Sequence, residues 1–282
     1  MKKNFFQGWY FKCSTDWETV AFIVALHHDG RQKSASLQVI NGTGSYFFSY
    51  PDIRYDRYSN VIRIGPNTFS LKGIALHIES ADLSISGFLK FSNRQRIAYD
   101  IMGPFRYVPL MQCRHKIYSM THQVTGRLNI GGQACHFAGH PGYIEGDRGT
   151  SFPKEYVWTH CHFPGGALTL AVAHIPFGCF HFTGVIGVVL IDGKEYRIAT
   201  YLGAKVQHIG SHIIWIRQGD YHLTAKLLQK KDFPLHAPQK GTMTRSIRES
   251  PMCSAQYHFY CNDQDILRFQ SDMASFEYEY PR

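Results

Sequence analysis

Apolar and polar residues alternate along short segments of this chain, and residues typical of turns separate the segments. In the first hundred residues these segments are "TVAFIVALHH", "SASLQVI", "SYFFSY", "VIRI", "TFSLKG", "IALHIE" and "DLSISGFLKF", with turns such as "DGRQ", "NGTG", "GPN" and "SNRQ" between them. Segments of about five to ten residues bounded by Gly, Asn, Asp and Pro are typical of antiparallel strands. The pattern predicts an all-β protein built from barrels or sandwiches.

Helix contributes little to this prediction. No window of a dozen residues repeats its apolar positions with a period of 3.6, and the best helix candidate is the short segment "VPLMQCRHKIYS", residues 108–119. A hairpin is expected at residues 120–137, and the second half of the chain then repeats the strand pattern of the first. We therefore expect two β units of similar size, residues 1–137 and 138–282.

One long segment carries no Asp, Glu, Lys or Arg. It runs from Phe163 to Ile191 and is long enough to span a bilayer, but Pro164, Pro176 and several glycines interrupt it. Its halves, "ALTLAVAHI" and "HFTGVIGVVLI", predict two strands that are each buried on both faces. Such strands need a cover, which is either a second sheet or an apolar ligand on the inner face.

The composition excludes a disordered chain, because 44% of the residues are hydrophobic and only 18% are charged. The formal net charge is +9, but the basic residues are scattered, which indicates a basic surface rather than a nucleic-acid-binding arm. Arg and Tyr interleave in "DIRYDRYSNVIRI" as they do in some single-strand binders, although a half-buried strand gives the same pattern. We expect no nucleic-acid partner; the charge is compatible with transient contact with anionic membrane surfaces.

The cysteines predict reduced thiols. There are seven, none in a C-x-x-C arrangement, and their spacing is irregular. The segment "MKKNFFQGWYFK" at the start of the sequence lacks the apolar core of a secretory signal. These features predict a cytoplasmic protein, with contact at the membrane periphery as the alternative. The sequence does not indicate an oligomeric state.

Two acids stand two residues apart in "GYIEGDRGTSFPKEYVWTHCHF", residues 142–163. In an extended chain Glu145 and Asp147 share one face with Tyr143, and Arg148 points elsewhere. Like charges held close resist joint ionisation, so one carboxyl group can stay protonated in an apolar site. The alternative is a polar β-turn in which Asp147 caps the turn and Arg148 pairs outward.

The strand "YVWTHCHF" follows. Alternation places four polar aromatic side chains on one of its faces: Tyr156, Trp158, His160 and His162. Two histidines two residues apart can share a zinc ion, but no second paired arrangement completes a ligand set, and we expect no metal. A cavity wall fits this face better, and its rings would stabilise a cation.

The chain resembles the tocopherol cyclase-like family. The resemblance rests on "FFQGWYFK", "GPFRYVPLMQCRHKIYSMTHQVTG", "GYIEGDRGTSFPKEYVWTHC", "ATYLGAK" and "LHAPQKGTMTRSIRES", in this order over nearly the whole length. The residues that match the plant cyclases are Tyr143, Glu145, Gly149, Phe152, Pro153 and Trp158. Two positions depart from the family: Gly146 replaces a basic residue, and Arg148 replaces an aromatic one. The second departure weakens the case for a long prenyl substrate.

The resemblance, which extends to carotenoid hydratases and other lipocalin-like proteins, implies a fold and a chemistry. It implies two lipocalin-like units with a ligand cavity near their junction, and cofactor-free protonation of a prenyl or terpenoid double bond. A phenol oxygen or water then captures the cation. The catalytic candidates are Glu145, Asp147 and His160, and the substrate-binding candidates are Tyr143, Tyr156, Trp158, His162, Trp9 and Phe105. The alternative function is a carrier that holds an apolar molecule unchanged.

Overall fold

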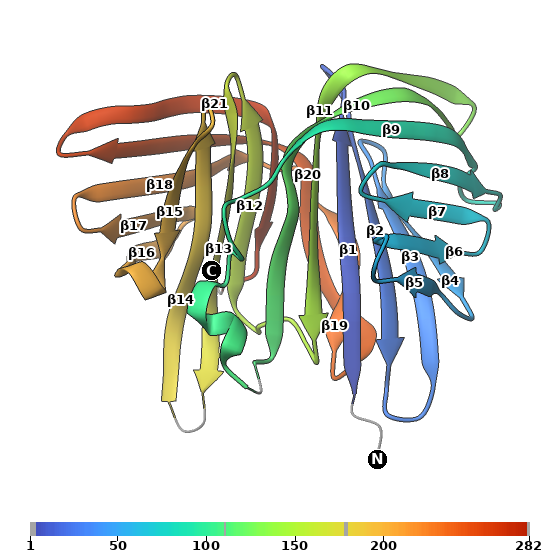
Figure 1. Ribbon diagram of the computed structural model, residues 1–282, viewed down its shortest axis with the longest axis horizontal. Coiled ribbons are helices and arrows are strands. Elements are labelled where there is room, and N and C mark those ends of the chain that lie inside the picture. Colours follow the sequence, from blue (N-terminus) through green and yellow to red (C-terminus); the bar gives the residue numbers. More distant parts are fainter. Residues whose placement is uncertain (1–3, 110, 178–179, 281–282) are drawn as a thin grey trace. The chain divides into compact units, whose positions relative to one another are not determined.

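The computed structural model describes residues 4–109, 111–177 and 180–280 and confirms the all-β prediction (Figure 1). The first sheet has the strand order β4-β3-β2-β1-β11-β10-β9-β8-β7-β6-β5, and all of its pairs are antiparallel. Its strands are β1 (Phe5–Ser14), β2 (Thr19–His28), β3 (Lys33–Ile40), β4 (Ser45–Tyr50), β5 (Arg54–Asp56), β6 (Val61–Ile64), β7 (Asn67–Ser70), β8 (Gly73–Ile78), β9 (Ile85–Gln95), β10 (Cys113–Ile130) and β11 (Gln133–Gly149).

The second sheet has the order β15-β14-β13-β12-β21-β20-β18-β17-β16, and β19 pairs with β20 beside this path. Its strands are β12 (Tyr156–Phe163), β13 (Gly166–Phe177), β14 (Phe180–Ile191), β15 (Lys194–Ala199), β16 (Lys205–Gly210), β17 (Ile213–Gln218), β18 (Tyr221–Gln229), β19 (Phe233–Gln239), β20 (Thr242–Cys261) and β21 (Gln264–Tyr278). The charge-free segment forms the β13–β14 hairpin, as expected.

The helical content of the described residues consists of two short 3-10 turns, η1 (Gly103–Tyr107) and η2 (Thr200–Leu202). The prediction of a helix within residues 108–119 is wrong, because β10 begins at Cys113 and pairs with both β9 and β11. No helix in the described part of the chain is long and apolar enough to cross a membrane.

The chain divides into two compact units that interleave along the sequence. The first comprises residues 4–96, 113–151 and 236–245, and the second the described parts of 97–112, 152–235 and 246–280. The predicted hairpin is present, with its turn at Gly131 and Gly132, but strand β11 continues through Phe137 to Gly149. It does so because residues 142–149 pair with β1 as well as with β10.

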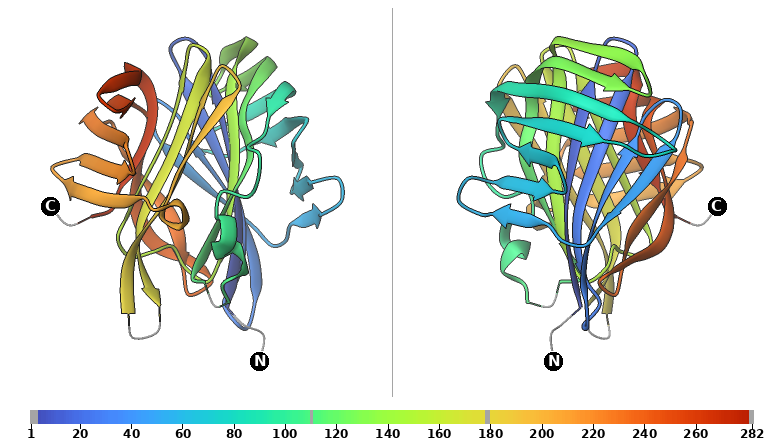
Figure 2. Two further views of the ribbon diagram at one scale, coloured as in Figure 1. Left: turned by 60° about the vertical axis from the view of Figure 1, so that its left-hand side comes forward. Right: turned by 90° about the vertical axis from the view of Figure 1, so that its right-hand side faces the viewer.

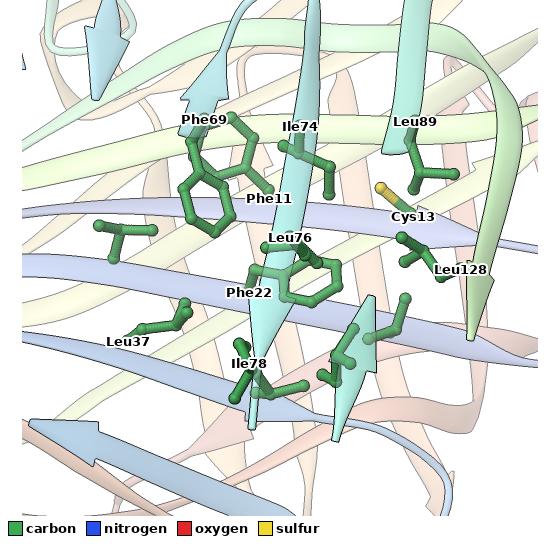
Figure 3. Packing of buried hydrophobic residues seen from close by; sticks show 14 of the residues in the cluster. Phe11, Cys13, Phe22, Leu37, Phe69, Ile74, Leu76, Ile78, Leu89 and Leu128 are labelled. Atoms are coloured by element: carbon green, nitrogen blue, oxygen red, sulfur yellow. The ribbon is translucent and has the colours of Figure 1, made fainter. Parts of the chain in front are cut away.

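The first unit has its apolar core between the long strands β1–β3 and the shorter strands β5–β9, which cross them (Figures 1 and 2). Phe69 contacts Phe11 and Phe22, with ring centroids 5.3 and 6.1 Å apart. Ile74, Leu76 and Ile78 of β8 are buried, in the strict alternation that the sequence shows (Figure 3). The second unit has a comparable core, whose buried side chains include Leu168, Leu170, Val185, Tyr257 and Phe259.

The central strand β1 is buried on both faces. Trp9, Phe11 and Cys13 point into the apolar core. Tyr10 and Lys12 point to the opposite face and are only 8% and 0% exposed. Burying a polar side chain is costly unless it is hydrogen-bonded or paired, so the polar side chains on this buried face are expected to have partners.

Candidate active site

Three of the predicted residues stand together on this buried polar face of the first unit. Tyr143, Glu145 and Asp147 alternate along β11, and Ile144 between them belongs to the apolar core. The segment is therefore a strand, and the alternative of a polar turn is wrong. Across the sheet, Tyr10 of β1 is the register partner of Glu145, and His115 of β10 is the partner of Asp147.

Glycines allow β11 to run close to its neighbours at this point. A Cβ atom at Gly146 would lie 2.7 Å from the carbonyl oxygen of Gly8 and 3.1 Å from the ring of Tyr118. A Cβ atom at Gly142 would lie 2.3 Å from Nε2 of His122. Position 146 faces the interior of the unit and leaves no room for the basic side chain that the resemblance led us to expect there.

His115 lies between the two carboxylates and holds them apart. Its Nδ1 donates to Oδ1 of Asp147 at 3.0 Å, and its Nε2 lies 3.3 Å from Oε2 of Glu145, an ion-pair contact rather than an aligned hydrogen bond. The same oxygen of Glu145 accepts a hydrogen bond from the Tyr143 hydroxyl at 2.5 Å. The side chains of His115 and Glu145 are 10% and 8% exposed.

These contacts determine the charge of the imidazole. Burial lowers the pKa of His115, but the negative charges of Glu145 and Asp147, together with the hydrogen bond to Asp147, outweigh burial and raise this pKa well above its usual value. His115 is therefore an imidazolium at neutral pH. One cation between two carboxylates reduces the repulsion that the sequence predicts for the acids.

Cys113 completes the cluster. Its thiol donates to Oδ1 of Asp147 with a sulfur–oxygen distance of 3.5 Å. Burial, together with the charge of Asp147, raises the pKa of Cys113 well above its usual value, so the thiol stays protonated. Each of the described cysteines, Cys113 included, is a free thiol.

The cluster also has the donor types of a metal site. Within the described residues, one group of at least three potential ligands has its donor atoms within 4.8 Å of one another: His115, Glu145 and Asp147. Imidazole nitrogen and carboxylate oxygen suit zinc. However, each carboxylate faces a different ring nitrogen, which is the arrangement that stabilises a doubly protonated imidazole, and a metal would have to replace one of these protons.

The remaining predicted residues lie on β12 of the second unit, with two exceptions. The faces of β12 are as predicted: Val157 and Cys161 enter the apolar core, and the opposite face carries Tyr156, Trp158, His160 and His162. The rings of His160 and His162 are 4.6 Å apart and perpendicular. No described residue joins them as a third ligand of a metal-binding group.

This face carries a second tyrosine–glutamate pair. The hydroxyl of Tyr156 donates to Oε2 of Glu277 on β21. Glu277 is the register partner of Trp158 on one side and of Glu249 on the other, and both glutamates are buried. The strand pattern does not single out Glu249 or Glu277. The only sequence signal for Glu277 is its place in "FEYEY", where acids alternate with tyrosines.

The two exceptions are Trp9 and Phe105. Trp9 faces the apolar core of the first unit and packs on Tyr55 at 4.7 Å, so it lies on the opposite side of the sheet from Glu145. Phe105 lies in η1 of the second unit, where its ring contacts Phe182 at 6.1 Å and Tyr201 at 5.8 Å.

The hydrophobic pattern of the sequence also does not single out His115. The only weak signal is that His115 follows Cys113 by two residues in "CRHK".

The fold and the cluster together define a two-unit lipocalin-like protein with a buried acid–imidazole–phenol site. Residues 77–278 match the family described as tocopherol cyclase-like, and the chain belongs to this family. The matched part contains His115, Tyr143, Glu145, Asp147 and the whole of β12. No curated protein sequence matches the chain.

Solved structures share the fold at low sequence identity. CghA with Sch210972 has a TM-score of 0.63 and 10% identity, over 98% of this chain and 88% of that one. Kievitone hydratase from Nectria haematococca has a TM-score of 0.56 and 6% identity, over 98% and 89%. A putative AttH from Nitrosomonas europaea has a TM-score of 0.56 and 10% identity, over 99% and 93%. These likenesses establish the fold.

Proposed function

We propose that this protein is an enzyme of the cyclase or hydratase type that adds a proton to a carbon–carbon double bond of a prenyl or terpenoid substrate. Membership of the tocopherol cyclase-like family supports a role of this type, and kievitone hydratase is a structural neighbour. The observation that carries the proposal is the buried imidazole of His115, with one carboxylate at each ring nitrogen.

The reaction is balanced without a cofactor. A proton adds to the less substituted carbon of the double bond, and the tertiary cation forms on the other carbon. A phenol oxygen of the same molecule, or a water molecule, then forms the new carbon–oxygen bond. The proton lost from that oxygen replaces the one consumed. The reaction is neither an oxidation nor a reduction, so it needs no electron donor or acceptor.

The cluster can hold and deliver this proton. Nε2 of the His115 imidazolium faces Oε2 of Glu145, so the carboxyl group can take a proton from the ring and present it to the substrate. Tyr143 fixes the carboxyl group through its hydroxyl. Asp147 accepts from Nδ1 of His115 and so orients the ring and stabilises its charge. Glu145 is the general acid, and His115 and Asp147 act through it.

The roles proposed for β12, which lies in the second unit, come from the family resemblance and not from a contact with the acid cluster. The rings of Tyr156 and Trp158 would stabilise a passing cation by roughly 0.5–2 kcal/mol each. His160, which is fully buried on the same face, would accept the proton that the attacking oxygen loses. These assignments rest on the family resemblance and on the shared face of β12.

The decisive experiment is turnover of a prenylated hydroquinone and of a terpenoid alkene in deuterated water. Wild type is expected to place one deuterium on the carbon that is protonated. Glu145→Gln should lower kcat by about 100-fold or more, the usual range for a general acid. Glu79→Gln is the matched control, because the side chain of Glu79 is 78% exposed. Full activity of Glu145→Gln would remove this residue from the mechanism.

Native mass spectrometry of protein purified from its own host distinguishes the alternative function, a carrier, from the proposed enzyme. A carrier would hold one unchanged lipid, whereas an enzyme would hold substrate and product as isomers or as a pair differing by one water. An unchanged ligand together with no deuterium incorporation would favour the carrier.

A further inference from the structure

The outer face of the first unit carries a row of side chains that the proposed chemistry does not use. Directly paired residues on neighbouring strands share one face of a sheet, so the row follows the register from β5 to β11. Ile64 and Leu89, which alternate with its members, enter the apolar core, so the row lies on the solvent side. The right-hand view of Figure 2 looks onto strands β5–β9. The row consists of Arg54, Arg63, Thr68, Ala75, Phe88, Arg127 and His136.

Exposed cations and one apolar ring dominate this row. Arg54, Arg63 and Arg127 are exposed, and Phe88 is 67% exposed although β9 lies inside the sheet. Lys90, two residues after Phe88, adds a fourth exposed cation to the same face. Neighbouring strands are about 4.8 Å apart, so the row extends over about 24 Å from Arg54 to Arg127. The cations are therefore spread over a surface rather than gathered around one small anion.

The cations are not balanced by carboxylates. Arg54 and Arg63 stand directly opposite each other on β5 and β6, and like charges in such a pair repel. Asp56, the only acid in the described strands β5 to β10, accepts from the backbone of Tyr58 and the hydroxyl of Ser59. Its charge also reaches Arg63. One carboxylate does not offset four cations, so this face keeps a net positive charge.

Two further acids lie at one end of these strands. They are Glu79 and Asp82, in the turn between β8 and β9. Glu79 faces His77, with Oε1 and Nε2 3.3 Å apart. These acids border the face and do not interrupt the row of Arg54, Arg63 and Arg127.

A plane of negative charge above an apolar layer matches this face. A protein interface has a core of several apolar side chains, whereas the row offers Phe88 and the small Ala75. Single-stranded nucleic acid stacks its bases on a series of aromatic rings, and the row contains no Tyr or Trp. Anionic headgroups attract clustered Lys and Arg, and a phenylalanine ring enters the boundary between headgroups and acyl chains.

We propose that this face docks on the surface of a membrane that contains anionic lipids. Arg54, Arg63 and Arg127 lie against the lipid phosphates, and Phe88 inserts between the headgroups. A prenyl or terpenoid substrate partitions into a bilayer, so docking brings the protein to the substrate of the proposed function. The docking itself does not rest on that function, and it is measured without any turnover.

Cosedimentation of the full chain with vesicles tests the proposal. We expect binding to vesicles of phosphatidylcholine and phosphatidylserine, and at least tenfold weaker binding to pure phosphatidylcholine. Salt should weaken the binding to the anionic vesicles. Arg63→Gln/Arg127→Gln should weaken it at least tenfold, because each cation near an anionic surface contributes about fivefold. Phe88→Ser should weaken it about threefold or more, because the ring no longer enters the boundary region.

Two control variants match these changes. Arg217→Gln/Lys226→Gln removes the same charge from exposed residues of the second unit and should bind nearly as wild type does. Tyr107→Ser removes a ring that is 77% exposed and should also bind as wild type does. Equal losses in the two double variants would show that the overall charge of +9 attracts the vesicles, and this result would overturn the proposal.

Other results also count against the face. They are the absence of binding to anionic vesicles, and tighter binding of a single-stranded oligonucleotide that depends on Arg63 and Arg127. If a variant fails to fold, Phe88→Trp decides the matter, because it keeps a ring at this exposed position. Lipids with brominated acyl chains should quench its added fluorescence on anionic vesicles, and quenching no greater than in wild type would exclude insertion at Phe88.

Discussion

Tyr143 donates its hydroxyl hydrogen to Glu145 across 2.5 Å, and both side chains stand on the same buried face of β11. The phenol thereby fixes one oxygen of the carboxyl group that we assign as the proton donor. The contact joins residues two apart in sequence, which an extended strand places on the same face. Its catalytic value comes from its neighbour on β10, His115, which approaches the same oxygen.

The first prediction concerns this tyrosine. Tyr143→Phe should lower kcat about tenfold or more, because the carboxyl group loses the donor that holds it. It should also lower the free energy of unfolding by about 1.5–3 kcal/mol, the range for a hydrogen bond to a charged group. Steady-state kinetics and urea titration measure both effects. Tyr107→Phe is the control, since Tyr107 is 77% exposed, and equal kcat values in the two variants would contradict the assigned role.

The second prediction concerns the charge of His115. Its pKa is raised in the folded protein, so its contribution to stability is fully present below the unfolded pKa of about 6.5. The contribution is lost as the pH rises through the raised value. His115→Gln should therefore be less stable than wild type by about 3–5 kcal/mol at pH 6, with a gap that narrows at alkaline pH. Urea unfolding between pH 6 and 10 measures this gap.

Catalysis should follow the same titration. In the pH–activity profile of wild type, activity should decline only where His115 loses its proton, well above pH 6.5. The profile of His115→Gln should lack this decline. His77→Gln, at a side chain that is 61% exposed, should keep the wild-type profile. A gap in stability that stays constant from pH 6 to pH 10 would show that His115 is not the charged member of the cluster.

The third prediction concerns the loss of folding stability at acid pH. Two buried histidines change the stability with pH in the direction opposite to His115. Burial lowers the pKa of His122 to about 3, assisted by the charge of Arg94, and burial lowers the pKa of His27 to about 4. Below pH 6.5 the unfolded chain binds protons that the folded chain does not, so stability falls as the pH falls. Each histidine contributes roughly 1.4 kcal/mol per pH unit to this slope.

His122→Asn should therefore lose less stability than wild type between pH 6.5 and 5. His115 opposes this slope near pH 6.5, where the unfolded chain takes up a proton that the folded chain already holds, and it adds nothing once both states are protonated. Urea titrations at the two pH values measure the difference, with His77→Asn as the exposed control. Parallel losses in wild type and His122→Asn would contradict the assignment.

The fourth prediction concerns the glycines of β11. Gly142→Ala would place a Cβ atom 2.3 Å from Nε2 of His122 and 2.7 Å from Val124, both in the packed interior. The free energy of unfolding should fall by about 1–3 kcal/mol, the usual cost of overpacking. Thermal unfolding followed by circular dichroism measures it. Gly42→Ala is the control, because no atom lies within 4 Å of a Cβ at that position, and equal melting temperatures would be inconsistent with tight packing at Gly142.

The fifth prediction concerns Arg197, which holds the segment of residues 97–112 in the second unit. Its guanidinium pairs with Glu195 at 2.6 Å and donates to the carbonyl oxygens of Tyr99 and Asp100. Arg197→Met should destabilise the protein by about 3–5 kcal/mol, because a buried network loses its cation. Limited proteolysis should then cut first within residues 97–112. Arg217→Met, whose guanidinium is exposed, should leave the cutting pattern unchanged.

The amino-acid sequence by itself determined most of the strands and their faces, although not the start of β10, where a helix was expected. Alternation is a property of a few consecutive residues, which is why Tyr143, Glu145 and Asp147 could be placed on one face, as could the four rings of β12. The steric reason for Gly146 was not visible in the sequence, because its neighbours Gly8 and Tyr118 are distant along the chain.

Only the tertiary structure decided which faces meet within each unit. His115 stands beside Asp147 because β10 pairs with β11 in one register, and that register shifts at Ser119 and at His122. Tyr156 reaches Glu277 because β12 pairs with β21, across 121 residues of sequence. Such pairings depend on the turns, bulges and packing of the whole sheet, and a shift of one residue would turn every side chain of a strand to the other face. The alternation along a strand therefore predicts which side chains share a face. The partner of the strand and its register are set by the complete fold.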